Sequence, residues 1–445
     1  MNGKTILVWF RNDLRIHDNE ILLEAVKKAD RIVPVYCFDP AHFGMSSFDT
    51  QKTGAIRAKF IIESVADLKQ SLQKLGGDLI VKFGHPQEIL PEIARQYAVT
   101  EVYHHREVAL EETETSSLVE AALWKLQINL KHFIGHTMYH KEDLPFPIKN
   151  IPDVFGVFRK KIERESIVRN CLDTPESISV PENMDIGRLL TLADLGLEEP
   201  IIQAFRGGET EGLRNISSYF LKPGLHRTKL SPWIALGCLS TRKLYWETRK
   251  QENSIPKETL NGIMLELLRR DYFRFMLKKH NNKFNKSPAN EDEQKVVDML
   301  FTSWKEARTG IPIIDATLNE LNSTGYISHQ GRQNVATFLI HSLQINWEYG
   351  AAFFKEKLID YSAASNLGNW HYLLNEISGN ASEKNIDFLK KAQECDPKGD
   401  YVRKWIPSLA SIPGVLIHQP WKLSPTELKQ YGIGDVSIYA ALSIA

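Results

Sequence analysis

The sequence lacks the signatures of several common kinds of functional site. Its four cysteines, Cys37, Cys171, Cys238 and Cys395, are far apart and form no C-x-x-C pair. This spacing argues against a zinc or iron–sulfur site and for a reducing compartment. The histidines show no H-E-x-x-H pattern, and no G-x-G-x-x-G follows the first predicted strand. We therefore expect neither a bound metal nor a conventional dinucleotide-binding loop.

Long apolar runs and an excess of one charge are missing as well. No apolar stretch reaches the roughly 18 residues that a membrane helix needs, and the opening MNGKTILVWF lacks the features of a signal peptide. Lys and Arg total 55, as do Asp and Glu, so any basic surface must be local. These absences predict a soluble, cytoplasmic, monomeric protein with no membrane partner.

The chain has the composition of a globular protein, and its first 135 residues alternate two patterns. With 445 residues, of which 42% are hydrophobic, two domains are expected. Short β-branched or aromatic runs are separated by amphipathic stretches, the clearest at 55–75. This alternation predicts an α/β domain over 1–135, with a doubly wound parallel sheet and ligands at the carboxyl ends of its strands. The strands are expected at 5–10, 31–38, 78–83, 100–105 and 128–135.

The second half of the chain has a different pattern. Residues 136–204 are rich in proline and irregular, which predicts an interdomain linker. From 205 onward, apolar residues recur at helical spacing, most clearly at 257–277, 310–323 and 331–359. We therefore predict an all-α domain over 205–445.

Polar and aromatic residues on these helices are the first candidates for a site. Glu266 and Arg270 are four apart and either form an ion pair, which their spacing favours, or line a polar cavity together. Trp347 and Trp370 lie on successive predicted helices, where core packing is the usual role of tryptophan. The basic, aromatic stretch at 269–286 is interpreted as a solvated helix end or, alternatively, as a nucleic-acid face.

Seven segments, taken together and in this order, resemble the photolyase/cryptochrome family. The resemblance covers nearly the whole chain, and two segments, GRQNV and FRGGETEGL, are similar to the DASH cryptochrome branch in particular. The seven segments are LVWFRNDLRIHDN (7–19), TKLSPWIALGCLS (228–240), ELLRRDYFRF (266–275), ARTGIPIIDATLNELNSTGYIS (307–328), GRQNVATFL (331–339), LIDYSAASNLGNW (358–370) and DPKGDYVRKWIPSL (396–409).

The resemblance implies two chromophores. Family members hold FAD in the helical domain, and an antenna pigment, often a folate such as methenyltetrahydrofolate, in or against the α/β domain. Glu111 and Glu112 lie in HREVALEE (105–112), which resembles the family segment whose acidic residue contacts the folate. The alternative is a solvated acidic turn. The loop that binds the FAD pyrophosphate is matched by a donor-rich turn before a helix, which suits an anion. Its residues are Arg227, Thr228, Lys229, Leu230 and Ser231.

The resemblance also assigns roles around the flavin itself. Glu266 matches a residue on the adenine side of the cavity that contacts the damaged pyrimidine in repair enzymes. Arg270 and Arg332 match arginines that contact the flavin, and Asp360 matches the carboxylate that pairs with Arg332. Asn366 matches the residue that faces flavin N5.

Trp370 and Trp347 match the inner two members of the electron-transfer chain that photoreduces the flavin. This match reverses the expectation of core packing alone. The third, outer tryptophan of that chain has no counterpart between residues 280 and 303.

Other positions depart from the family pattern. Ser362 replaces a second aspartate, and Arg269 replaces a tryptophan that packs on the lesion in repair enzymes. His329 and Gln330 replace an Asn-Arg pair, and Tyr219 is only a candidate for the tyrosine that binds the flavin phosphate. His329 also falls where (6-4) photolyases keep a histidine that protonates the lesion, a role suited to its pKa. A polar substitute that helps to hold the cofactor is the preferred interpretation of His329.

Three functions follow. The leading prediction is a blue-light flavoprotein that photoreduces FAD through Trp370 and Trp347 and binds single-stranded or damaged DNA. The second is a deoxyribodipyrimidine photo-lyase, with the lesion flipped into the cavity beside Glu266 and Gln333. The third is a degenerate member that has lost the flavin, as Ser362 suggests, and acts as a binding protein.

Overall fold

A five-stranded parallel sheet forms the core of the first domain. The computed structural model describes residues 3–221, 228–280, 291–379 and 388–433. The strand order is β3-β2-β1-β4-β5, which is a doubly wound arrangement. Every predicted strand is present, and the ends differ by at most two residues. The strands are β1 (Thr5–Phe10), β2 (Arg31–Phe38), β3 (Ile80–Phe83), β4 (Glu101–His105) and β5 (Asn129–Phe133).

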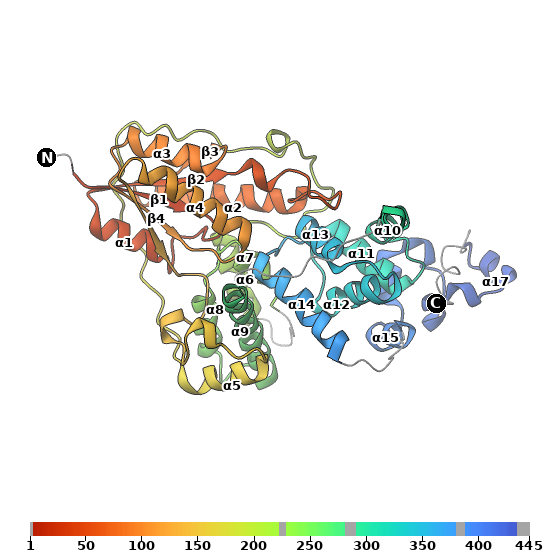
Figure 1. The fold of residues 1–445 in the computed structure, drawn as a ribbon. Helices are drawn as coiled ribbons and strands as arrows, with labels where there is room; N and C mark the ends of the chain where they lie inside the picture. The colour runs from red at the N-terminus through yellow and green to blue at the C-terminus, as the bar shows by residue number, and fades with distance from the viewer. Residues whose placement is uncertain (1–2, 222–227, 281–290, 380–387, 434–445) are drawn as a thin grey trace.

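Helices cover both faces of this sheet (Figure 1). Ile6, Val8 and Phe10 of β1 join the core formed with α1 and α2, while Leu7 and Trp9 join the core formed with α3 and α4. Successive residues of a strand point to opposite faces, so a strand with helices on both sides is apolar throughout. The helices are α1 (Glu20–Lys28), α2 (Ala55–Lys74), α3 (Pro86–Gln96) and α4 (Leu110–Trp124).

The prediction of an irregular linker was wrong for one segment. Residues Phe155–Glu165 form α5, whose Phe158 packs 5.0 Å, between ring centroids, from Tyr272 of α9 (Lys257–Lys279). The amphipathic pattern of this short helix is hidden by the proline-rich chain on either side. The segment between the domains therefore contributes a wall to the helical domain.

Beyond α5, the regular elements of the described chain are helices. Residues 331–359, predicted as one helix, are divided into α12, a π-helical turn at Phe338–Ser342, and α13. The division occurs where Gln344 has a left-handed φ of 53° and the Asn346 side chain caps Glu348 N. The remaining helices are α6 (Glu209–Leu221), α7 (Ser231–Ala235), α8 (Thr241–Lys250), α10 (Glu291–Lys305), α11 (Pro312–Thr324), α12 (His329–Thr337), α13 (Trp347–Lys357), α14 (Ala363–Gly379), α15 (Phe388–Cys395), α16 (Asp400–Trp405) and α17 (Pro425–Gln430).

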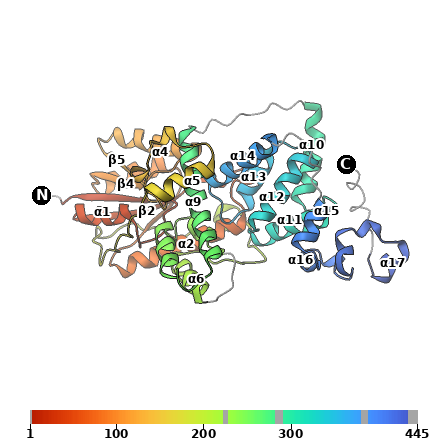
Figure 2. The same ribbon diagram turned by 90° about the horizontal axis from the view of Figure 1, so that it is seen from below.

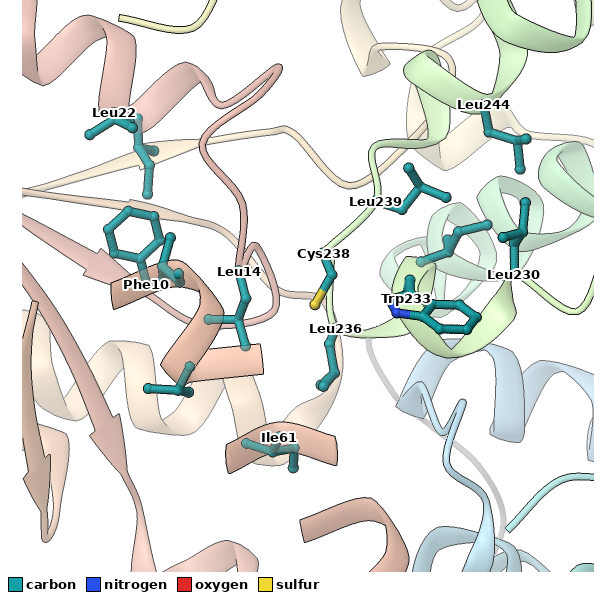
Figure 3. Close-up of a cluster of buried hydrophobic side chains, with 14 of the residues drawn as sticks. Phe10, Leu14, Leu22, Ile61, Leu230, Trp233, Leu236, Cys238, Leu239 and Leu244 are labelled. Atoms are coloured by element: carbon teal, nitrogen blue, oxygen red, sulfur yellow. The ribbon is translucent and has the colours of Figure 1, made fainter. Parts of the chain in front are cut away.

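One hydrophobic core joins the α/β domain to the segment around α7. Figure 3 shows Phe10 and Leu14 on one side of this core and Leu230, Trp233 and Leu239 on the other. All five side chains are at most 3% exposed. The loop and short helix at 228–240 are therefore held by the first domain, although they belong to the second.

A buried polar clamp reinforces this junction. Asp18 accepts hydrogen bonds from Arg242 Nε (3.0 Å) and Nη2 (2.7 Å), and Arg15 Nη1 donates to the Gly237 carbonyl (2.8 Å). Hydrogen bonds between charged groups are stronger than neutral ones, and here they are shielded from water. The segment 7–19 thus positions 228–240.

The helices that follow are grouped beside α9. Figure 2 shows α11, α12, α13 and α14 together, and α14 packs directly against α9. Gly368 allows this close approach, because a Cβ at that position would overlap the Phe273 ring. No helix among the described residues is long and apolar enough to cross a membrane.

Candidate functional site

A cavity of about 410 Å³ lies between the 228–231 loop, α9, α12 and the start of α14. This volume is typical of ligand pockets. A second, adjoining hollow shares six of its residues and extends to Asn366 and Trp370. Arg227 lies outside the described residues. The predicted site residues that line the main cavity are Thr228, Lys229, Leu230, Ser231, Glu266, Arg270, His329, Arg332, Asp360 and Ser362.

Asp360 is the centre of a hydrogen-bond network in the cavity wall. Arg332 Nη2 lies 2.9 and 2.7 Å from its two carboxylate oxygens, and Ser231 Oγ donates to Oδ2 at 2.6 Å. The Asp360 side chain is 4% exposed and that of Arg332 is 23% exposed. The network connects the start of α7 to α12, so it fixes a cation at the cavity surface. The predicted partnership of Arg332 and Asp360 is present.

Arg270 is held by backbone carbonyls. Its guanidinium donates to the His136 carbonyl and, at 3.4 Å, to that of Ile234. Burial, together with the nearby Arg274, lowers the pKa of Arg270 to about 10, so the side chain stays charged at neutral pH. Glu266 lines the same cavity one helical turn away. The structure therefore favours the second interpretation of this pair, in which both residues line a polar cavity.

The 228–231 loop presents a strained backbone to the cavity. Lys229 has a left-handed φ of 51°, which is uncommon for a residue other than glycine. Thr228 Oγ1 accepts from Leu230 N at 3.3 Å, while the Leu230 side chain is fully buried in the core. Leu230 thus anchors the loop, and the lining groups of Thr228, Lys229 and Ser231 supply donors.

The two tryptophans lie one behind the other at the cavity wall. Trp370 is 2% exposed, and its ring centroid is 6.5 Å from that of the partly exposed Trp347. Trp370 Nε1 donates to Asn366 Oδ1 at 3.1 Å, and Asn366 Nδ2 donates to the Ala351 carbonyl at 3.0 Å. The Asn366 amide is therefore fixed in one orientation. Both tryptophans also join the helical core, so packing and electron transfer are compatible roles.

Trp347 ends the run of tryptophans. Its only other ring contact in the described chain is His371, at 5.1 Å between centroids. Trp370 is seated against Gly350, where a Cβ would overlap its indole ring. Every tryptophan of the sequence lies in the described ranges.

The positions that depart from the family pattern have different surroundings. Ser362 and His329 line both hollows, His329 as the first residue of α12. Arg269 lies at the cavity edge beside the rings of Phe155 and Tyr372. Tyr219 is buried against Phe220 and is not among the residues that line the cavity.

The basic, aromatic stretch at 269–286 is mainly an internal element. Tyr272, Phe273, Arg274 and Phe275 are buried, and Arg274 Nη2 donates to Glu107 of the α/β domain at 3.0 Å. For residues 272–275, neither a solvated helix end nor a nucleic-acid face is therefore correct, because the surrounding protein buries this turn of α9 on all sides. Arg269, which lines the cavity, is not part of that buried turn. Residues 281–286 lie outside the described ranges.

Glu111 and Glu112 have partners within the protein. Glu111 forms ion pairs with Lys355 (2.7 Å) and Lys52 (3.5 Å), and Glu112 accepts from Ala109 N at 3.2 Å. Burial, with the charge of Glu107, raises the pKa of Glu112 to about 7. A solvated acidic turn is therefore wrong for Glu112, whereas the side chain of Glu111 is 51% exposed. Binding of an antenna there stays a prediction.

Several cavity residues were missed from the sequence. Ser365 and Asn369 line the cavity with Ser362 and Asn366, which makes a polar stripe with helical spacing along α14. That spacing was visible in the sequence. Tyr326 also lines the cavity, and burial beside Asp360 raises its pKa to about 12. It gave no comparable signal, because it precedes α12 in an irregular turn.

Comparisons with known proteins agree with this architecture. A family model described as "FAD binding domain of DNA photolyase" matches residues 263–444, and one described as "DNA photolyase" matches residues 6–178. Cryptochrome DASH of Gloeobacter violaceus is 40% identical, covering 97% of this chain and 91% of that protein. Cryptochrome DASH of Natronomonas pharaonis is 38% identical, covering 96% and 95% respectively.

Solved structures give the same result. The crystal structure of a Synechocystis cryptochrome aligns with a TM-score of 0.89 at 38% identity, covering 97% of this chain and 94% of that chain. A class III photolyase from Agrobacterium tumefaciens, 23% identical, shares the fold with a TM-score of 0.83, covering 99% and 94%. The chain belongs to the photolyase/cryptochrome family, and its helical domain is an FAD-binding domain.

Proposed function

We propose that this protein is a blue-light flavoprotein of the DASH cryptochrome type, in which Trp370 and Trp347 supply electrons to FAD, and that it binds single-stranded or damaged DNA. The observation that carries the proposal is the buried Trp370 at the wall of the cavity, in ring contact with the partly exposed Trp347. When bound, FAD supplies the absorption of blue light and accepts an electron. The chain must then hold the cofactor, orient it and deliver that electron.

The donor groups of the cavity fit an anionic cofactor. Lys229 and the hydroxyl of Thr228 are the groups we assign to the pyrophosphate, because a cation and a hydroxyl line that side of the cavity, whereas the Ser231 hydroxyl donates to Asp360. The Arg332–Asp360 pair, held on its other side by Ser231, presents an oriented guanidinium to the flavin. We assign Arg270, Glu266 and His329 to further polar contacts with the cofactor.

Asn366 orients the site toward the flavin ring. Its carbonyl oxygen accepts from Trp370, and one of its amide hydrogens is donated to the Ala351 carbonyl. The second amide hydrogen is then the group that can bond to a ligand in the cavity. A fixed donor at this place addresses a ring nitrogen of the flavin. Ser362 adds a hydroxyl where a carboxylate is usual, so the site keeps a polar group but loses a charge.

The visible absorption spectrum of the purified protein tests the proposal first. Oxidised flavin bands, with about one FAD released per chain on heating, are expected. Blue light with added thiol is then expected to bleach those bands. A colourless protein that takes up no added FAD would overturn the proposal and leave the flavin-free binding protein.

A DNA photolyase is the second candidate. The exposed ring of Tyr372, which is 39% exposed, and the carboxylate of Glu266 lie where a flipped base would enter. Arg269 at the same edge argues against tight stacking of a pyrimidine dimer. Illumination of the reduced protein with dimer-containing single strands tests this candidate, and no restored strand at enzyme excess would exclude it.

We propose a cytoplasmic monomer as the working form. All four cysteines are free thiols, which suits a reducing compartment. Light scattering coupled to size-exclusion chromatography is expected to give a mass close to 50.9 kDa. Twice that mass would overturn the monomer.

A further inference from the structure

Arg269 is held at the mouth of the cavity by aromatic rings. Its Cζ lies 5.3 Å from the ring centroid of Phe155, at the start of α5, and 5.8 Å from that of Tyr372 on α14. Both contacts are cation–π contacts, in which the cation lies over the face of an aromatic ring. Among the side chains that the structure describes, which exclude those of residues 375–379, none forms a hydrogen bond or an ion pair with the guanidinium of Arg269.

The other two arginines of the cavity are already committed. Arg332 is paired with Asp360, and Arg270 donates to two backbone carbonyls. Arg269 instead has no hydrogen-bond acceptor among the described side chains, and a guanidinium carries five N–H donors. An arginine that lines the cavity beside two rings, with no described acceptor, can receive an acceptor group from outside the protein.

We propose that Arg269 receives a backbone phosphate of single-stranded DNA at the cavity mouth, while Tyr372 offers its ring to the adjoining base. The proposal rests on the DNA-binding part of the proposed function. A guanidinium edge matches two phosphate oxygens, and aromatic rings bind unpaired bases of any sequence.

A single strand suits this mouth better than a duplex. Arg269 and Tyr372 stand side by side, so a phosphate and the base next to it reach both at once only when that base is unstacked. The formal net charge of the whole chain is zero, so electrostatic attraction to a strand must come from local cations such as Arg269. Repair enzymes have a tryptophan at this position that packs on the lesion. In this chain Arg269 would contact the DNA strand instead.

Binding of a fluorescent oligo(dT) to the flavin-loaded protein, measured by anisotropy over a range of salt concentrations, tests the inference. We expect R269Q to weaken binding about tenfold and to reduce the slope of log K against log salt by about 0.7, the value for one phosphate on a single strand. R269K keeps a charge, so it should retain the slope and lose only about threefold in affinity. The matched control is R188Q, since Arg188 is 67% exposed and pairs with Asp194 far from the cavity.

A second measurement uses the unaltered protein. Oligomers with one neutral methylphosphonate linkage at successive positions should bind normally except at one position, where affinity falls about tenfold. In R269Q that position should lose its effect. This comparison stays informative if a variant folds poorly, because the wild-type scan alone locates a single critical phosphate.

The outcomes separate the inference from the function on which it rests. A wild-type protein that does not bind oligo(dT) would overturn the DNA-binding part of the proposed function. Wild-type binding with an unchanged affinity and slope in R269Q would overturn only the role of Arg269. Weaker binding by R269Q with an unchanged slope would show that Arg269 contacts bases, which also overturns its role as a phosphate receptor.

Discussion

Replacing Asp360 by asparagine should remove most of the affinity for FAD while leaving the fold intact. The carboxylate is 4% exposed and neutralises Arg332, whose side chain is 23% exposed. Asparagine has a similar shape but no charge, and it has one oxygen to accept from Arg332 where aspartate has two; its NH2 group can face Ser231 only if that hydroxyl becomes the acceptor. Arg332 would then stand at the cavity surface without its partner.

The magnitude follows from the geometry. Removing one partner of a buried ion pair costs about 3–5 kcal/mol, and partial exposure of Arg332 reduces this to roughly 2–3 kcal/mol. A factor of ten in affinity corresponds to about 1.4 kcal/mol, so the Kd for FAD should rise about 30- to 150-fold. The upper value applies when the whole loss is expressed in cofactor binding.

Reconstitution of the apoprotein with FAD, followed by quenching of flavin fluorescence, measures this Kd. The matched control is Asp396→Asn, which removes another buried carboxylate of the helical domain, one that accepts from Tyr401 N and Val402 N at 3.1 Å. It should reduce stability without changing the Kd. A wild-type Kd in Asp360→Asn, or an equal loss in Asp396→Asn, would refute the role of the Arg332–Asp360 pair.

Three further predictions concern electron transfer, packing and pH. Trp370→Phe should reduce flavin photoreduction to background in steady blue light with thiol, whereas Trp347→Phe should slow it; unchanged bleaching in Trp370→Phe would leave packing as its role. Gly350→Ala should cost about 1–3 kcal/mol in urea unfolding, because its methyl group displaces the Trp370 indole, and a wild-type midpoint would contradict the close contact. Burial places the pKa of His104 well below 6.5. Below about pH 6.5 the unfolded chain therefore takes up a proton on His104 that the native state does not. The free energy of unfolding should then fall by about 1.4 kcal/mol per pH unit. His104→Gln should remove that contribution, which unfolding at pH 7 and pH 5.5 would reveal as a smaller difference than in the wild type.

The sheet and the long helices were predictable because their patterns are regular. β1 is apolar at every position, as a strand covered on both faces requires, and α9 keeps helical spacing over its length. The break between α12 and α13 was not predictable, because the apolar spacing continues across it. It depends on the backbone of Gln344 and the cap by Asn346, which are local features that periodicity does not record.

The candidate site was predictable in its members but not in its connections. Asp360 and Arg332 came from the family resemblance, yet the third member of their network, Ser231, was assigned to the phosphate. Residues from segments far apart in the sequence meet there, and no spacing rule reports such contacts. The sequence showed that Arg269 departs from the family pattern, but not that it contacts the ring of Phe155. That contact depends on α5, a helix that the proline-rich sequence around it concealed.

The hydrogen bond from Trp370 to Asn366 has a consequence for what happens after an electron leaves the indole. An oxidised indole becomes a strong acid at its ring nitrogen, and its fate depends on whether a base stands beside that proton. Here the neighbour is an amide oxygen at 3.1 Å, which accepts a hydrogen bond but is far too weak a base to take the proton. On the proposed electron route, the positive hole would therefore not be trapped on Trp370 by proton loss. It would stay mobile and pass to the partly exposed Trp347, where solvent water can act as the first proton acceptor.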